Sequence, residues 1–211
     1  DLRPISVMSV VYRLWAARRL QNLRHWQESW ATASQHGFRA EHSPENVHWV
    51  LALKVEAALL DGVPLHGMRF DYSKCFDKVP HSILLPLLDS MGLSRRILKP
   101  VQTMYGNLLR RFKIAGGVGT EFLATNGIFQ GCPISVIFLN ALLSVWARAV
   151  ETEVPDATPD AFADDTGACS SNPAAIQQVA NVTMEFATAT NQELSSSNIL
   201  FFSTSHGHEL S

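Results

Sequence analysis

The spacing of apolar residues predicts that the chain begins with two helices. Apolar side chains recur at helical intervals over residues 10–30. After a break at Gly37, Ser43 is a potential N-cap, and Pro44 suits the first turn of a second helix. That helix is expected to end at Gly62.

The remaining pattern mixes short strands with helices. A strand is expected through Met68 and Phe70, where apolar and polar residues alternate. The later elements are helices over 81–92 and 94–107, a hairpin over 110–130 that turns at Gly116, Gly117 and Gly119, a long helix from Pro133 to about Glu151, a hairpin over 159–170 with Asp164 and Asp165 at its tip, a helix over 173–190 and a strand over 199–204. This order predicts an α+β fold with a small antiparallel sheet.

Composition sets only broad bounds on function. The chain has 211 residues, of which 46% are apolar and 17% charged, as expected for one or two globular domains. A net charge of -2 gives no overall attraction for nucleic acid, so such a partner would need local basic patches. Cys75, Cys132 and Cys169 form no CxxC pair, which predicts reduced thiols in an intracellular protein and argues against a zinc module.

The most apolar stretch, Ile128 to Val150, is interrupted by Gln130, Asn140 and Arg148. It is therefore interpreted as a buried helix and not as a membrane span, and no membrane partner is expected. No signal peptide is recognisable. Because the chain begins at residue 1 without a methionine, we expect it to be a segment of a longer protein.

Two adjacent carboxylates, Asp164 and Asp165, stand inside a short apolar stretch. At about 4 Å and an effective dielectric constant near 20, two like charges repel by roughly 4 kcal/mol, which a bound divalent cation reverses. A polar hairpin turn explains the same residues equally well. From these two residues alone, both interpretations stay open.

Two further segments carry candidate chemistry. Asp71 follows the predicted strand, where a carboxylate is both rigid and accessible and suits Mg²⁺, although a turn or N-cap aspartate is the simpler explanation. Gln130, Gly131 and Pro133 belong to a loop that leads into a helix. Its free backbone N–H groups and the Gln130 amide suit a nucleotide, but an ordinary helix start has the same pattern.

Taken together, these segments resemble the sequence blocks of reverse transcriptases, in the same order and spacing. The matching blocks are FDYSKCFDKV at 70–79, QGCPIS at 130–135 with Phe138 and Asn140 downstream, and FADDT at 162–166. Upstream, RPISVMSVVYRLWAARRL and QHGFRAEHSPENV resemble the fingers blocks of the non-LTR retrotransposon and group II intron branch. The resemblance covers nearly the whole chain.

This resemblance implies a right-hand polymerase fold. Residues 1–64 would be helical fingers and 65–211 the palm, with an inserted fingers segment around 95–125 and the thumb absent. The implied activity is that of a retroelement's RNA-directed DNA polymerase, which adds deoxynucleotides to a DNA primer on an RNA template. The implied location is intracellular, and nuclear for a eukaryotic element.

The resemblance also implies roles for individual residues. Two Mg²⁺ ions, with Mn²⁺ as a possible substitute, would be held by the catalytic Asp71, Asp164 and Asp165 together with Tyr72. The aromatic Phe76 would reject a 2′-hydroxyl. The other implied contacts are Arg3, Phe76, Gln130 and Gly131 to the nucleotide, and Arg39, Pro133 and Ser135 to template or primer.

One position departs from the family pattern. Asn198 stands where a lysine usually serves as general acid for the departing pyrophosphate, and an amide cannot deliver that proton. Two explanations stay open: turnover is slow, or the alignment of this block with the family is shifted. Two other functions stay open: a decayed or domesticated domain that binds RNA without copying it, and an RNA-directed RNA polymerase, against which Phe76 argues.

Overall fold

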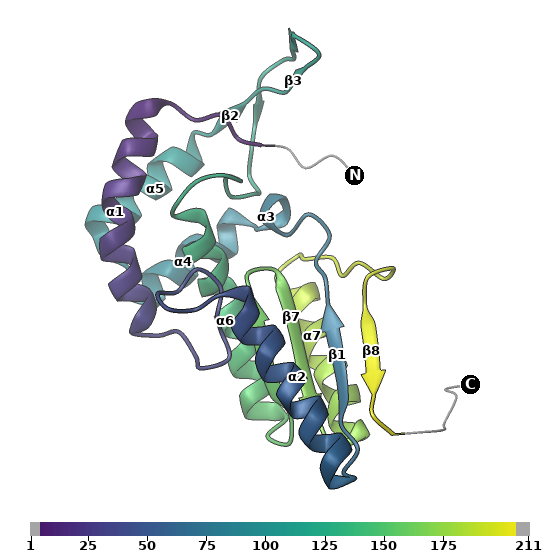
Figure 1. Ribbon diagram of the computed structural model, residues 1–211. Coiled ribbons are helices and arrows are strands. Elements are labelled where there is room, and N and C mark those ends of the chain that lie inside the picture. The colour runs from purple at the N-terminus through teal and green to yellow at the C-terminus, as the bar shows by residue number, and fades with distance from the viewer. Residues whose placement is uncertain (1–4, 206–211) are drawn as a thin grey trace.

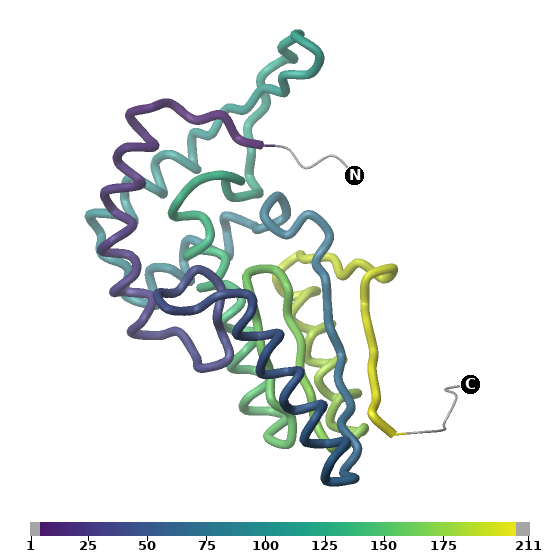
Figure 2. Tube along the Cα trace, viewed as in Figure 1, coloured from purple at the N-terminus to yellow at the C-terminus, as the bar shows by residue number. Residues whose placement is uncertain are grey.

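A computed structural model describes residues 5–205 of the chain. Arg3, for which a nucleotide contact is predicted, lies outside these residues. The described chain forms one group of elements around a four-stranded sheet and a second, mainly helical group beside it (Figures 1 and 2).

The sheet is antiparallel throughout, as predicted. Its strands are β6 (Thr158–Phe162), β7 (Asp165–Ser170), β1 (His66–Phe70) and β8 (Leu200–Ser203), in that spatial order. The central pair, β1 and β7, is aligned so that Phe70 lies opposite Thr166. Because the two strands run in opposite directions, the end of β1 lies beside the beginning of β7 (Figure 1).

Helices α6 (Ser135–Glu153) and α7 (Pro173–Ala189) pack against each other and against the sheet. Trp146 of α6 is fully buried, and its indole N–H donates to the Thr183 hydroxyl of α7 at 2.9 Å. By length and composition α6 is apolar enough to cross a membrane, but 67% of that stretch is buried inside the protein. It has the burial of a core helix, as the sequence predicts.

Helix α2 (Pro44–Asp61) packs against the edge strand β6. Both of its predicted ends are confirmed. At the N-terminus the Asn46 side chain accepts a hydrogen bond from the backbone N–H of Ser43 at 2.6 Å. At the C-terminus Gly62 adopts the left-handed conformation, with φ of 66°, that favours glycine.

The second group contains α1 (Val10–Glu28), α4 (His81–Ser90) and α5 (Arg95–Gly106), close to their predicted bounds. A hairpin projects from it (Figure 1), formed by β2 (Leu109–Arg110) with β5 (Phe122–Leu123) and β3 (Lys113–Ile114) with β4 (Gly117–Val118). Of the three glycines expected to turn this hairpin, only Gly116 has a positive φ.

Two local features differ from the prediction. The tip of the β6–β7 hairpin is formed by Ala163 and Asp164, with Ala163 at φ 54°, whereas Asp165 already pairs with Phe162 as the first residue of β7. A short helix, α3 (Cys75–Lys78), follows β1 where no helix is predicted. Four residues are too few to show a helical repeat of apolar positions.

Replacing Trp146 by alanine should lower the free energy of unfolding by about 3–5 kcal/mol, because a large buried side chain is lost and Thr183 loses its partner. Urea denaturation of the chain measures this change. The control is Trp49→Ala on α2, where the side chain is 68% exposed and an effect within about 0.5 kcal/mol is expected. Equal losses in both variants would contradict the assignment of α6 as the core helix.

Candidate active site

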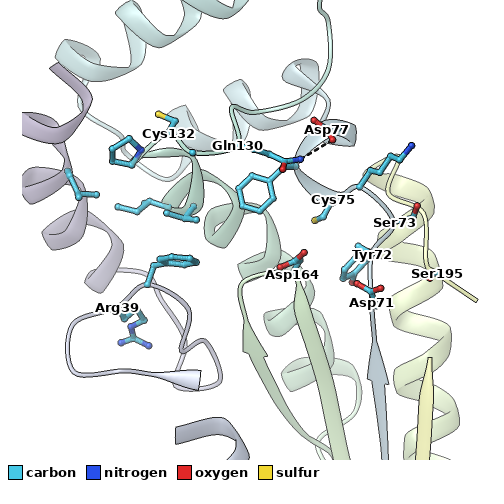
Figure 3. A pocket seen from close by; sticks show the side chains of 18 of the residues that line it. Arg39, Asp71, Tyr72, Ser73, Cys75, Asp77, Gln130, Cys132, Asp164 and Ser195 are labelled. Carbon is cyan, nitrogen blue, oxygen red and sulfur yellow. Dashed lines mark hydrogen bonds between the residues drawn. The ribbon is translucent and has the colours of Figure 1, made fainter. Parts of the chain in front are cut away.

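A cleft of about 860 Å³ opens where the two groups of elements meet (Figure 3). Its walls come from segments far apart in the sequence: α1, the chain after residue 37, the end of β1 with α3, the loop before α6, the β6–β7 tip and the loop before β8. A cleft of this size accommodates a ligand as large as a nucleotide.

Asp71 and Asp164 enter this cleft from neighbouring strands. Asp71 follows β1 and Asp164 precedes β7, and Figure 3 shows their side chains close together. The Cys75 thiol lies near both: its pKa is raised, chiefly by burial and further by the charges of Asp164 and Asp71. The predicted convergence of these two carboxylates is therefore present.

The donor set fits a magnesium ion that shares its coordination with a substrate. Mg²⁺ is usually bound by one or two carboxylates plus phosphate oxygens and water, and the cleft offers two carboxylates. Within residues 5–205, no three His, Cys, Asp or Glu side chains are grouped as a complete metal site. The Tyr72 side chain is buried against Phe186, so of this residue only the backbone carbonyl is a possible ligand.

Asp165, predicted as a third ligand, is placed differently. It is exposed in β7 and does not line the cleft. Asp165 already pairs with Phe162 in the strand ladder, whereas Asp164 belongs to the turn at the hairpin tip. In this structure Asp71 and Asp164 share the cleft without Asp165.

Phe76 reaches the cleft because the chain turns sharply after β1. Lys74 adopts the left-handed conformation, with φ of 55°, and begins α3. Phe76 lies on this helix, lines the cleft and packs partly against the core. The predicted gate residue therefore lines the same cleft as the two carboxylates.

The loop that carries Gln130 is fastened to α3 by its backbone. The N–H groups of Gly127 and Ile128 donate to the carbonyls of Val79 and Phe76, each at 2.8 Å. Gly127 has φ of 85°, and a Cβ there would lie 2.8 Å from the Asp77 carbonyl oxygen. Only glycine permits so close an approach between the loop and α3.

Gln130 is oriented by a specific partner. Its Nε2 donates to Asp77 Oδ2 at 3.0 Å, which turns the amide oxygen away from Asp77 (Figure 3). Burial raises the pKa of Asp77, while Arg110, Lys74 and the Gln130 bond oppose this shift. Gly131, next along the chain, lines the cleft with φ of 90° and open space around it.

The base of the projecting hairpin holds the same loop. Arg110 Nη2 donates to the Gly127 carbonyl at 2.7 Å, and its guanidinium lies 5.2 Å from the centre of the Phe129 ring. His81 Nε2 lies 2.9 Å from the same carbonyl oxygen. The loop is thus fixed from α3, from α4 and from the hairpin.

The three residues predicted to contact template or primer differ in accessibility. Arg39 and Pro133 line the cleft. The Arg39 guanidinium is bound to Glu28 at 2.7 Å and to two backbone carbonyls, so it already has a structural role. Ser135 is 1% exposed at the start of α6 and does not line the cleft, so its contact with template or primer stays a prediction.

Cys75 and Ser195 are among the cleft residues that sequence reasoning missed, and so is one connection between predicted segments. Cys75 lies between Asp71 and Phe76 in the sequence, and its position there is the only signal that could have identified it. Ser195, whose backbone N–H donates to the Asp71 carbonyl at 2.8 Å, has no such signal. The hydrogen bond between Asp77 and Gln130 joins two of the sequence blocks that were identified. The bond itself could not be predicted, because only the tertiary fold brings the two residues together.

Known proteins resemble this chain in sequence. The family model described as reverse transcriptase (RNA-dependent DNA polymerase) matches residues 1–208. A Pol polyprotein of a type-2 retrotransposable element of Drosophila melanogaster is 25% identical over 195 residues, covering 88% of this chain and 18% of that protein. An uncharacterized 149 kDa protein of transposon TX1 from Xenopus laevis is 26% identical over 140 residues, covering 63% of this chain and 10% of that protein.

Among solved structures, telomerases have a similar fold. An apo telomerase of Candida tropicalis superposes with a TM-score of 0.69 at 14% identity, covering 92% of this chain and 37% of that one. The Candida albicans telomerase, in complex with a fragment of telomeric RNA, gives a TM-score of 0.63 at 15% identity, covering 92% of this chain and 34% of that one. At these identities the comparison shows the fold alone.

Acid should lower the free energy of unfolding through the buried His81 ring. The pKa of His81 is lowered, chiefly because burial disfavours the charged ring; the Gly127 bond opposes this shift and Arg110 adds to it. The unfolded chain therefore takes up a proton near pH 6.5 before the folded chain does, so the free energy of unfolding falls below about pH 6.5.

Denaturation midpoints measured between about pH 7.5 and about pH 5 test this, and His81→Gln should show a smaller decline than the natural chain. His36, whose pKa is also lowered by burial, remains in both proteins and cancels in the comparison. Identical declines would show that His81 is not the group responsible.

Proposed function

Because the chain belongs to the reverse transcriptase family, on its non-LTR retrotransposon branch, we propose that it is the catalytic core of an RNA-directed DNA polymerase. Its fold is the right-hand polymerase fold of the telomerase reverse transcriptases. The chain spans only 18% of the length of the Drosophila relative and 10% of the length of the Xenopus relative. The activity of the whole protein is therefore also a proposal.

One observation supports this function most strongly. The end of β1 and the beginning of β7 bring Asp71 and Asp164 into a single cleft that Phe76 and Gln130 also line. Two carboxylates facing a nucleotide-sized space are the arrangement that metal-assisted nucleotidyl transfer requires.

We assign the two carboxylates to divalent cations. Two Mg²⁺ ions, when bound, supply activation of the primer 3′-hydroxyl and neutralisation of the triphosphate charge. Asp71 and Asp164 would hold them, with the backbone carbonyl of Tyr72 as a further donor. The protein contributes chiefly by positioning the reacting groups, which is where most of the rate enhancement of such transfers arises.

The remaining cleft residues would select and orient the nucleotide. Gln130, held by Asp77, presents its amide oxygen, and Gly131 offers unhindered backbone. Phe76 would lie under the sugar and exclude a 2′-hydroxyl. In this proposal the sheet with α6 and α7 is the palm, the helical group with its hairpin belongs to the fingers, and the partners are an RNA template, a DNA primer and deoxynucleotides.

Asp164→Asn should abolish Mg²⁺-dependent extension of a DNA primer on an RNA template, with a loss of at least about 100-fold, because each metal interaction contributes several kcal/mol. Incorporation of labelled deoxynucleotide by the protein that carries this chain is the measurement. Asp165→Asn is the matched control and should lose less, since Asp165 is exposed outside the cleft. RNA binding by the natural protein without incorporation under any metal would instead favour the domesticated-domain alternative.

Phe76→Val should raise the use of ribonucleotides relative to deoxynucleotides, because it removes the ring that excludes a 2′-hydroxyl. The ratio of kcat/KM for matched ribo- and deoxynucleotides measures this selectivity. Phe112→Val, on the exposed hairpin, is the control and should leave the ratio unchanged. A natural protein that already prefers ribonucleotides would overturn the assignment and favour an RNA-directed RNA polymerase.

A further inference from the structure

The loop between α7 and β8 lies along the segment that carries Asp71. The backbone N–H of Ser73 donates to the Glu193 carbonyl at 2.7 Å, and Tyr72 forms an antiparallel bridge with Leu194. The N–H of Ser195 donates to the Asp71 carbonyl at 2.8 Å. The pairing of β1 with β8 is thus resumed beyond the strand ends, and it fixes this loop beside the cleft.

Asn198 extends from this loop to the Asp71 carboxylate. Its Nδ2 donates to Asp71 Oδ2 at 2.6 Å, and both residues line the cleft. The backbone N–H of Asn198 donates to the Ser195 carbonyl at 2.9 Å, so the residue is held in a local turn. The contact joins residues 127 positions apart and depends on the tertiary fold.

The direction of the Asn198 amide is set by Asp71, because an ionised carboxylate only accepts hydrogen bonds and therefore faces the donor end of the amide. The Ser197 hydroxyl donates to Asn198 Oδ1 at 3.2 Å, which occupies the acceptor end of the amide. A reversed amide would place its oxygen against the carboxylate and lose the hydrogen bond to Asp71, whereas the Ser197 hydroxyl could then accept instead of donate.

We propose that Asn198 is a positioning residue, which holds the Asp71 carboxylate in the orientation that receives the divalent cation. This inference rests on the proposed function, because it assumes that Asp71 is a metal ligand. Hydrogen bonds that orient a ligand typically change metal affinity 10- to 100-fold when they are removed.

The chemistry of an amide suits this role. Asn198 is neutral, so it orients the carboxylate without placing a positive charge beside a dication. Its single hydrogen bond to Oδ2 leaves most of the acceptor capacity of the Asp71 carboxylate for a cation. A lysine at the same position would also donate a hydrogen bond, but its charge would oppose cation binding.

Direct titration of the 211-residue chain with Mn²⁺, following free Mn²⁺ by electron paramagnetic resonance, tests the proposal without relying on catalysis. Asn198→Leu keeps a similar side-chain size and removes the donor, and it should raise the Kd for Mn²⁺ by about 10-fold or more. Ser196→Ala, in the same exposed loop, is the matched control and should leave the Kd unchanged. Circular dichroism checks that each variant is folded.

Asn198→Lys provides an independent comparison. It should weaken Mn²⁺ binding through charge repulsion, and the loss should shrink as the salt concentration rises. Tighter binding or no change in this variant would overturn the proposal.

Asp164→Asn separates this inference from the proposed function. If Asp164→Asn binds Mn²⁺ as the natural chain does, the metal site itself is wrong. If Asp164→Asn loses Mn²⁺ while Asn198→Leu binds it normally, the metal site stands and only the role of Asn198 is overturned.

Discussion

The pairing of β1 with β7 is the constraint on which the site depends. Phe70 lies opposite Thr166, so the last residue of β1 is fixed against the beginning of β7 by the backbone ladder itself. A shift of one residue would turn every side chain of one strand to the other face of the sheet. The helices α6 and α7 behind the sheet specify the register, because they bury one face of it. Asp71, which follows β1, and Asp164, which precedes β7, are therefore brought together by the pairing of the two strands.

Backbone hydrogen bonds also fix two loops against the segment that follows β1. The loop before α6 is bonded to α3, and the loop before β8 is bonded to the residues that follow β1. Gly127 permits the first of these approaches, since any larger residue would collide with the Asp77 carbonyl. Side chains then refine the arrangement: Asp77 turns the Gln130 amide, and Asn198 contacts Asp71. The cleft is thus held mainly by rigid backbone, which suits a site that acts by positioning.

Much of the fold was predictable because its signals are local. Ser43 and Gly62 mark the ends of α2, and alternation of apolar residues identified the strand that precedes Asp71. The site residues were recognised from the order of short sequence blocks, and Asp71 and Asp164 do share a cleft. What local sequence does not encode is the placement of each side chain. Asp165 is adjacent to Asp164 but is exposed and does not line the cleft, and Ser135 is buried by packing at the start of α6.

The central place of β1 also bears on how the protein reaches its folded state. Its two partner strands, β7 and β8, both come from the last third of the chain, and the contact between Asp71 and Asn198 spans 127 positions. Contacts between such distant segments require large loops to close, and they slow folding relative to helix formation. We therefore expect the helices to form before the cleft does. During synthesis on the ribosome, the carboxylates would meet only after the β6–β7 hairpin has emerged.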